Sequence, residues 1–337
     1  MQLKSKPDDF IVEELSTLNF IPEGKFSYYK LKKTNVEINA ALQQIASHWK
    51  INQKYINIAG NKDKTAVTTQ YISISQGPKE NMKSQNLELL FLGSGKQQLQ
   101  LGMLDGNRFA ITVREITEKE KQYFLKNLQH ISLFVNYYDD QRFGNNKNNH
   151  IIGRHLVRKE FKEACALICA VSYYPHILVQ KYLNRNPTDV IGALRTLPKK
   201  LLLLFVHAYQ SWLWNECAQQ FVLSQKKHKT FTYNLGNLCF STVTMKQRTI
   251  PIIGFDIECD DYGVTAVVQK IMKQEKITSR DFLPKQMPEL LTAGGKRDLL
   301  ISCSDFSYEE IDKETLILHF ALGKGSYATM IVKQLFA

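Results

Sequence analysis

The chain has 337 residues, more than one typical small domain and enough for two. Hydrophobic residues make up 44% and aromatic residues 11%, which argues against a disordered chain. Lys and Arg outnumber Asp and Glu by 44 to 32, and the net charge of +12 fits a partner that carries phosphates, the alternative being a basic protein that binds nothing specific.

The first third of the chain alternates predicted strands with predicted helices. Thr34 and Asn35 offer a cap for a helix that runs to about Trp49, with Ile38 and Leu42 on its apolar face. A charged helix is predicted at 118–129. Runs rich in β-branched and aromatic residues predict strands at 10–14, 28–32, 55–59, 71–75, 87–92, 98–103, 109–116 and 132–138.

The middle of the chain is mostly helical and holds most of the basic excess. Long periodic segments predict helices at 154–173 and 201–223, and a polar region at 224–288 contains a strand-like run at 264–268. Residues 145–290 contain 20 basic and 11 acidic residues, which leaves 24 and 21 for the rest of the chain. We therefore expect an RNA partner to be bound largely by the middle of the chain, the alternative being a basic surface that is only solvated.

The tail returns to a predicted strand at 315–321 and ends in a predicted helix at 327–335. The β-rich ends thus flank a helix-rich centre. An α+β domain interrupted by an inserted domain explains this order better than two domains in series.

The cysteines and the apolar stretches indicate the compartment. Six cysteines form no Cys-x-x-Cys pair and no zinc-like group with His, and Cys165 and Cys169 are predicted to pack in the core. Residues 1–14 are charged and lack the apolar segment of a secretory signal, and no apolar stretch is long enough to cross a bilayer. We expect a soluble cytoplasmic protein without a structural metal.

Three segments resemble nucleotide-binding motifs but do not complete them. Lys64 stands where the guanine-reading N-K-x-D element needs Asp, and Gln97 stands where a phosphate loop needs Ser or Thr. Residues 323–328 match G-x-G-x-x-[GA], but only nine residues follow, too few for a dinucleotide-binding unit.

The segment 58–70 reads I-A-G-N-K-D-K-T-A-V-T-T-Q. It places Asp63 in a short loop between two strands, after Gly60, which frees the backbone, and between Lys62 and Lys64. Such a loop would present one carboxylate within a positive field. The alternative is a turn aspartate that caps its own backbone.

The segment 136–144 reads N-Y-Y-D-D-Q-R-F-G. It places stacking rings, an amide and an arginine at the end of a predicted strand, a mixture suited to unstacked bases and phosphates. The alternative is an aromatic corner of the core with a surface arginine.

These two segments resemble motifs of the TruD family of tRNA pseudouridine synthases, A-G-x-K-D-[KR]-x-A-x-T-x-Q and N-Y-[FY]-G-x-Q-R-F-G. Four weaker resemblances follow the family order, at residues 4–14, 101–107, 210–215 and 323–332. Asp139 departs from the family's usual glycine, and we expect this acid to alter the local contact with RNA. Tyr138 stands where the family often has Phe, and we expect its ring to keep the stacking role.

The resemblance implies an α+β fold in which a pseudouridine-synthase catalytic domain, with a mixed and largely antiparallel sheet, is interrupted by an inserted helix-rich α/β domain. The catalytic domain would comprise residues 1–144 and 291–337, and the insertion residues 145–290. The implied reaction isomerises uridine 13 of tRNA. It breaks the C1′–N1 bond, rotates the uracil and rejoins it through C5, so that no metal or small-molecule cofactor is implied. The implied partner is tRNA, and no membrane is implied as a partner.

The resemblance also assigns site residues. The uridine must leave its stack before a carboxylate can reach its ribose. Asp63 would be the catalytic residue, and Tyr138 would stack on the flipped uracil. Lys4 would contact the RNA or the carboxylate, and Asn136 would order the pocket. Lys62 and Arg142 would either bind the substrate or anchor loops.

Two other classes of function stay open at this level. A non-catalytic RNA-binding or RNA-folding module would use the same residues without forming pseudouridine. A metal-dependent nuclease needs clustered carboxylates, for which Asp139 and Asp140 are the only hint.

Overall fold

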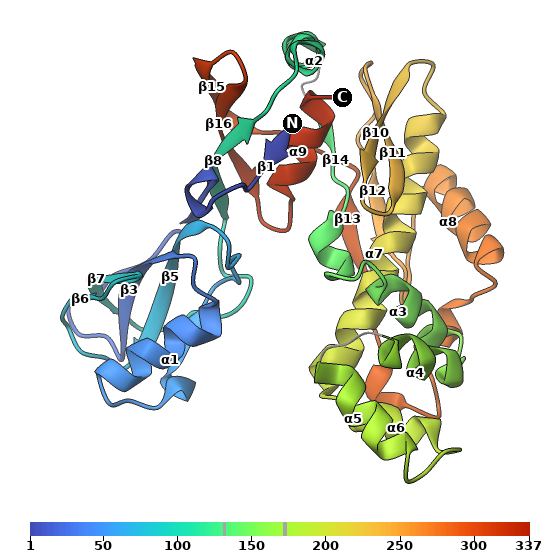
Figure 1. Ribbon diagram of the computed structural model, residues 1–337, viewed down its shortest axis with the longest axis horizontal. Helices are drawn as coiled ribbons and strands as arrows, with labels where there is room; N and C mark the ends of the chain where they lie inside the picture. Colours follow the sequence, from blue (N-terminus) through green and yellow to red (C-terminus); the bar gives the residue numbers. More distant parts are fainter. Residues whose placement is uncertain (131–132, 171–173) are drawn as a thin grey trace. The chain divides into compact units, whose positions relative to one another are not determined.

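The computed structural model describes residues 1–130, 133–170 and 174–337 (Figure 1). Its contacts divide the chain into two compact units. Unit 1 comprises Met1–Leu125 and Ser302–Ala328, and unit 2 comprises Lys126–Ile301 and Thr329–Ala337. These limits differ from those of the expected insertion at residues 145–290, which stays a prediction.

Unit 1 is built on one large sheet. In its described residues the strand order is β15-β16-β8-β2-β5-β3-β7-β6, with β1 added to β8 and β4 added to β5. Among the described strand pairs of this sheet, only β2 and β5 run parallel, so the sheet is mixed and largely antiparallel, as expected. The strands are β1 (Gln2–Leu3), β2 (Phe10–Leu15), β3 (Phe26–Thr34), β4 (Ile56–Ile58), β5 (Val67–Ser75), β6 (Met82–Lys83), β7 (Leu87–Gly95), β8 (Gly106–Arg114), β15 (Ser304–Asp312) and β16 (Thr315–Gly323).

Helix α1 (Ile38–His48) covers one face of the β3–β5–β7 part of this sheet (Figure 1). Its buried residues Leu42 and Ile45 belong to one apolar cluster with Leu31 and Ile72 of the strands. The helix begins later than Thr34 and Asn35 predict. Glu37 caps it by accepting a hydrogen bond from the backbone N–H of Ala40.

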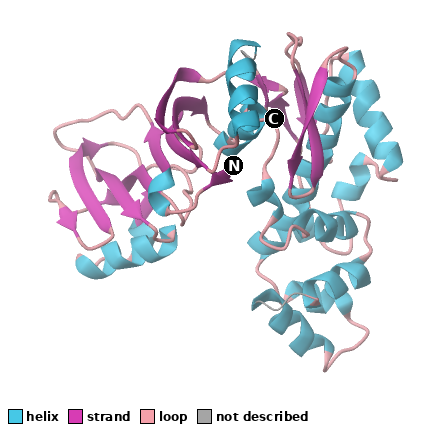
Figure 2. Ribbon diagram, turned by 45° about the horizontal axis from the view of Figure 1, so that its top comes forward, coloured by secondary structure: helices cyan, strands magenta, loops and turns pink. Residues whose placement is uncertain are grey.

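Unit 2 is rich in helices, as Figure 2 shows. The long helix α7 (Lys199–Leu223) buries side chains around its whole circumference, because other elements of unit 2 pack on all its sides. The other helices are α3 (Asn149–Val157), α4 (Phe161–Cys169), α5 (Tyr174–Leu183), α6 (Val190–Arg195) and α8 (Tyr262–Gln274), while α2 (Glu118–His130) and α9 (Ala328–Leu335) run across the limits of the two units. Short antiparallel pairs join β9 (Phe134–Val135) to β14 (Leu300–Ile301), β10 (His228–Tyr233) to β11 (Gly236–Ser241), and β12 (Thr249–Ile252) to β13 (Gly295–Asp298).

Most predicted elements are confirmed to within a few residues. The strands predicted at 10–14, 28–32, 55–59, 71–75, 87–92, 109–116 and 315–321 correspond to β2, β3, β4, β5, β7, β8 and β16. The helices predicted at 118–129, 201–223 and 327–335 correspond to α2, α7 and α9. The α+β class is therefore confirmed.

Two strand predictions are wrong. Residues 264–268 lie in α8, because Asp261 caps the backbone N–H groups of Gly263 and Val264 and begins a helix despite the β-branched run. Residues 98–103 contain no strand, and residues 101–102 form a turn in which Gly102 has a positive φ of 93°.

Two further predictions hold only in part. The helix predicted at 154–173 is interrupted between α3 and α4, where Lys159 has a φ of 63°, and residues 171–173 lie outside the described part. Of the strand predicted at 132–138, only β9 is present, and residue 132 also lies outside. The edge strand β15 was missed because its side chains are mostly exposed and polar.

No helix in the described ranges combines the length and the apolar character that a membrane span requires.

Candidate active site

Asp63 lies in the loop that connects β4 to β5, here called the Asp63 loop (residues 59–66). The two strands pair antiparallel through Ile58 and Ile72, so the chain must reverse within this loop. The side-chain amide of Gln70 donates to the carbonyl of Gly60, and the N–H of Asn35 donates to the carbonyl of Ala66. Both ends of the loop are therefore fixed to the sheet.

The Asp63 carboxylate forms an ion pair with Lys4. The Lys4 Nζ lies 2.6 Å from Asp63 Oδ2, and the two side chains are 22% and 28% exposed. The same ammonium lies 3.9 Å from the centre of the Phe10 ring. Since Lys4 touches the carboxylate directly, the structure brings together two of the predicted site residues, and it leaves part of the carboxylate side chain accessible.

Lys62, the residue before Asp63, has a different partner. Its Nζ lies 2.6 Å from Glu14 Oε2, with the side chains only 7% and 0% exposed. Gly60 does not need a positive φ. A Cβ at this position would instead lie 3.0 Å from Lys62 Nζ and 3.5 Å from Glu14 Oε2. A side chain at this position would therefore crowd the buried ion pair, which favours glycine here.

Lys33 of β3 reaches the same loop from the sheet. Its side chain is 0% exposed, and its Nζ donates a 2.7 Å hydrogen bond to the main-chain carbonyl of Asp63. Burial lowers the pKa of Lys33 to about 8, and the nearby charge of Asp63 opposes part of that effect. The sequence analysis missed this residue, because nothing in a run of lysines shows which one is buried.

The floor beneath the Asp63 loop is therefore polar and buried. Glu14, Lys33, Thr68 and Gln70 are all at most 1% exposed. Burial also raises the pKa of Glu14 above its ordinary value, with Lys62 acting in the opposite direction. Buried polar groups of this kind are unfavourable unless a network satisfies them, and they are common where a structure holds a reactive group in place.

The second set of predicted residues gathers in unit 2 around Arg297 of β13. The guanidinium of Arg297 donates to the backbone and side-chain oxygens of Asn136, at 2.9 and 2.6 Å. Its central carbon lies 4.1 Å from the centre of the Tyr138 ring, and that of Arg142 lies 5.6 Å from the same ring. Asn136, Tyr138 and Arg142 therefore form one cluster, with Arg297 as the member that the sequence did not reveal.

Asn215 of α7 holds the backbone of this cluster. Its side-chain oxygen accepts from the N–H of Tyr138 and its amide donates to the carbonyl of Tyr138, both at 2.9 Å. The neighbouring Trp214 packs its ring edge-to-face with that of Tyr138, at 5.7 Å and 87°. The ring of Tyr138 is thereby fixed in place, and the whole residue is only 8% exposed.

Arg142 is tied to α7 as well. Its Nε donates to the Ser211 hydroxyl at 2.8 Å, and that hydroxyl donates to the backbone carbonyl of His207. Arg142 thus has an anchoring contact with α7.

Asp139, the departure from the family motif, is turned inward. Its carboxylate lies 2.6 Å from Lys333 Nζ, accepts from the Thr329 hydroxyl, and caps the turn by accepting from the N–H of Asp140. Lys333 also pairs with Asp140, at 2.7 Å. This acid therefore joins residues 139–140 to α9. Asp139 is only 5% exposed, so it has little surface to offer to RNA.

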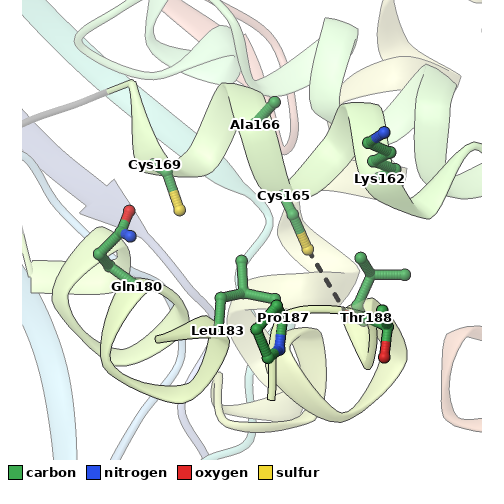
Figure 3. A pocket seen from close by; sticks show the side chains of 9 residues that line it. Lys162, Cys165, Ala166, Cys169, Gln180, Leu183, Pro187 and Thr188 are labelled. Atoms are coloured by element: carbon green, nitrogen blue, oxygen red, sulfur yellow. Dashed lines mark hydrogen bonds between the residues drawn. The ribbon is translucent and has the colours of Figure 1, made fainter. Parts of the chain in front are cut away.

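A cavity of about 480 Å³ lies among α4, α5 and α6 of unit 2 (Figure 3). Cys165 and Cys169 line it, and the Cys165 thiol donates to the carbonyl of Val190 at 3.5 Å. Cys165 is buried as predicted, whereas Cys169 is half-buried. Burial raises the pKa of both thiols, so neither is a strong nucleophile near neutral pH.

Comparison with known proteins gives a consistent result. The model of the family described as tRNA pseudouridine synthase D (TruD) matches residues 1–176, 173–233 and 244–335. The tRNA pseudouridine synthase D of Aquifex aeolicus is 30% identical, over 100% of this chain and 98% of that protein. A protein of Thermococcus sibiricus with the same assignment is 31% identical, over 99% and 94%.

A solved structure agrees with these sequence matches. The crystal structure of a protein from Methanosarcina mazei, also assigned as a tRNA pseudouridine synthase D, superposes with a TM-score of 0.74 at 25% identity. The match covers 99% of this chain and 93% of the other. The similarity thus extends over both units.

Proposed function

Because the chain belongs to the TruD family of tRNA pseudouridine synthases, we propose that it isomerises uridine 13 of tRNA with Asp63 as the catalytic carboxylate. The family makes the protein an isomerase whose substrate is tRNA. The position of the uridine and the residues that act on it form the proposal.

The surroundings of the Asp63 carboxylate support its choice as the catalytic group. Its carboxylate is part-exposed, is paired with Lys4 at 2.6 Å, and stands on a loop that is fixed from beneath by buried polar groups. An ionised carboxylate can attack C1′ of the ribose, stabilise an oxocarbenium-like species, or remove a ribose proton.

We assign the binding of the extruded uracil to the Tyr138 cluster. Little of the Tyr138 ring is exposed, and Arg297 lies over it. A base can stack on the ring only when a guanidinium moves aside, and the displaced Arg297 could then pair with a phosphate or a carbonyl of the RNA. Before the base enters, Asn136 would order the pocket, because it fixes Arg297 over the Tyr138 ring through two hydrogen bonds.

For Lys62 and Arg142, the structure contains contacts within the protein that offer an alternative to a substrate contact. Lys62 pairs with buried Glu14, and Arg142 bonds to Ser211. We propose anchoring as the main role of Lys62, since a side chain 7% exposed can offer RNA little contact. Arg142 keeps its proposed role in binding.

The reaction rearranges bonds within one nucleotide. It needs no electron donor and no group donor, so we propose that it proceeds without a metal or a small-molecule cofactor. We also propose the cytoplasm as its location, since tRNA is its substrate.

The test of Asp63 is the variant Asp63→Asn. It keeps the shape of the side chain and removes the negative charge, so we expect pseudouridine formation in unmodified tRNA transcripts to fall at least about 1,000-fold. Affinity for tRNA should stay within about threefold, because most binding energy comes from phosphate contacts. Pseudouridine would be mapped at single-nucleotide resolution.

The matched control is Asp8→Asn, the same change at an exposed acid of unit 1. It should retain the wild-type rate. Near-normal activity of Asp63→Asn would remove Asp63 from the proposed role. Binding of tRNA by the wild-type protein without any new pseudouridine would instead favour the non-catalytic RNA-binding alternative.

A further inference from the structure

Lys33 breaks the apolar pattern of β3. Alternate residues of a strand share a face, and on this face Tyr29 and Leu31 are fully buried in the apolar cluster beneath α1. Lys33 is the next residue on the same face and is also 0% exposed. It lies opposite Thr68 of β5 and Leu87 of β7, so β3 has a neighbouring strand on both sides at this position.

An ammonium group at such a position is unfavourable for stability. Removal of a charged group from water costs free energy that hydrogen bonds and nearby charges repay only in part. The lowering of the pKa of Lys33 to about 8, caused by burial, reflects the same effect. Lys33 lies where the apolar cluster meets the buried polar residues Thr68 and Gln70, so the packing of the cluster does not explain a lysine here.

The contact made by Lys33 supplies another explanation. Its Nζ donates to the main-chain carbonyl of Asp63, while Lys4 binds the carboxylate of the same residue. One lysine thus fixes the backbone of Asp63 from inside the sheet and the other contacts its side chain. A shift of about 1 Å in a reacting group can slow an enzyme about 100-fold, so a fixed backbone at this residue has a direct consequence for rate.

We infer that Lys33 is a positioning residue for the pseudouridine-forming reaction, which holds the Asp63 backbone so that its carboxylate meets the ribose in one geometry. This inference rests on the proposed catalytic role of Asp63. Lys33 is buried, so it acts through Asp63 without touching the tRNA.

The test is Lys33→Met, which keeps an unbranched side chain of similar length and removes the donor. We expect the single-turnover rate constant at saturating enzyme to fall at least about tenfold, with the Kd for tRNA within about twofold of wild type. The melting temperature should fall by at most a few degrees, because the removal of a buried charge offsets much of the loss of this donor to the Asp63 carbonyl. A large loss of rate with a small change in stability separates positioning from a structural role.

The matched control is Lys32→Met, the same change on the neighbouring residue, whose side chain is exposed. It should leave the single-turnover rate constant unchanged. A normal rate in Lys33→Met would overturn the inference, as would a lower melting temperature that accounts for the lost rate. If Asp63→Asn is inactive and Lys33→Met is active, only this inference fails; if Asp63→Asn is active, the proposed function fails.

Discussion

At the scale of single residues, the lysines around Asp63 have different partners. Lys4 binds the carboxylate, Lys62 binds buried Glu14, and Lys33 binds the main-chain carbonyl. Lys4 and Lys62 could be named from the sequence, because they stand in motifs. Lys33 could not, because its contact joins residues that are thirty positions apart and depends on the pairing of β3 with β5.

The buried Lys33 also predicts a pH dependence of stability. Its pKa is about 8 in the folded protein, against about 10.4 for an exposed lysine. Between these values the unfolded chain binds a proton that the folded protein lacks, so the contribution of Lys33 to the free energy of unfolding rises with pH. Below about pH 8 both states hold the proton, and the burial of the charge lowers the free energy of unfolding by its full amount.

The free energy of unfolding of wild type minus that of Lys33→Met should therefore rise from about pH 8 towards about pH 10. Urea unfolding of both proteins across this range measures it, and the difference isolates Lys33 from other titrating groups. The charged groups that face Lys33 are Asp63 and Lys62 of the loop and Glu37 before α1. A difference that does not vary with pH would mean that Lys33 keeps its proton throughout.

At the scale of elements, α7 supports the Tyr138 cluster through one side chain. Asn215 pairs with both backbone groups of residue 138 and is fully buried. Asn215 belongs to the segment 210–215, one of the segments that resemble family motifs, and its side chain contacts the backbone of another such segment. A motif residue can thus act by fixing the backbone of another motif.

Replacement of Asn215 by Ala should destabilise unit 2. It leaves the N–H and C=O of Tyr138 buried without these partners, which costs about 2–4 kcal/mol. A lower melting temperature in calorimetry would show this, with Asn146→Ala, at an exposed asparagine, as the control that should melt like wild type. An unchanged melting temperature for Asn215→Ala would mean that residue 138 finds other partners.

The departure at Asp139 is also explained at this scale. The sequence suggested an altered contact with RNA, but the carboxylate binds Lys333 and Thr329 of α9. The acid thus holds the end of the chain against the strand-end segment that carries Tyr138. Asp140 shares the same lysine, so the pair of carboxylates has an internal cation as its partner.

At the scale of the whole molecule, charge should dominate the affinity for tRNA. Each neutralised phosphate releases counterions, so we expect the association constant to fall at least about 10-fold between about 50 and 200 mM salt. Residues 145–290 hold 20 of the 44 basic residues and only 11 of the 32 acidic ones. Filter binding or anisotropy over a salt series measures the slope.

Variants can test which part of the chain supplies this charge. Four exposed lysines of unit 2 (Lys199, Lys200, Lys226 and Lys227) replaced by Gln should weaken binding and flatten the salt slope. The charge-matched control replaces four exposed lysines of unit 1 (Lys50, Lys54, Lys79 and Lys83) and should have the smaller effect. A larger effect of the unit 1 set would contradict the placement of the main contacts in the middle of the chain.

The sequence by itself determined the α+β class, most elements, the family and the identity of Asp63 as the candidate carboxylate. These depend on local periodicity and on motifs, which are contiguous in the chain. It failed at residues 264–268, because a capping aspartate outweighed β-branched propensity, and at the exposed edge strand β15, whose polar side chains give no pattern.

Only the tertiary structure decided which polar side chains are buried and which atoms they meet. The contacts of Lys33 with Asp63, of Arg297 with Tyr138, and of Asp139 with Lys333 each join distant parts of the chain. The free energy of a buried charge depends on its surroundings in three dimensions, and strand pairing and helix packing create those surroundings. A linear pattern therefore names the carboxylate, whereas the groups that hold it are known only from the fold.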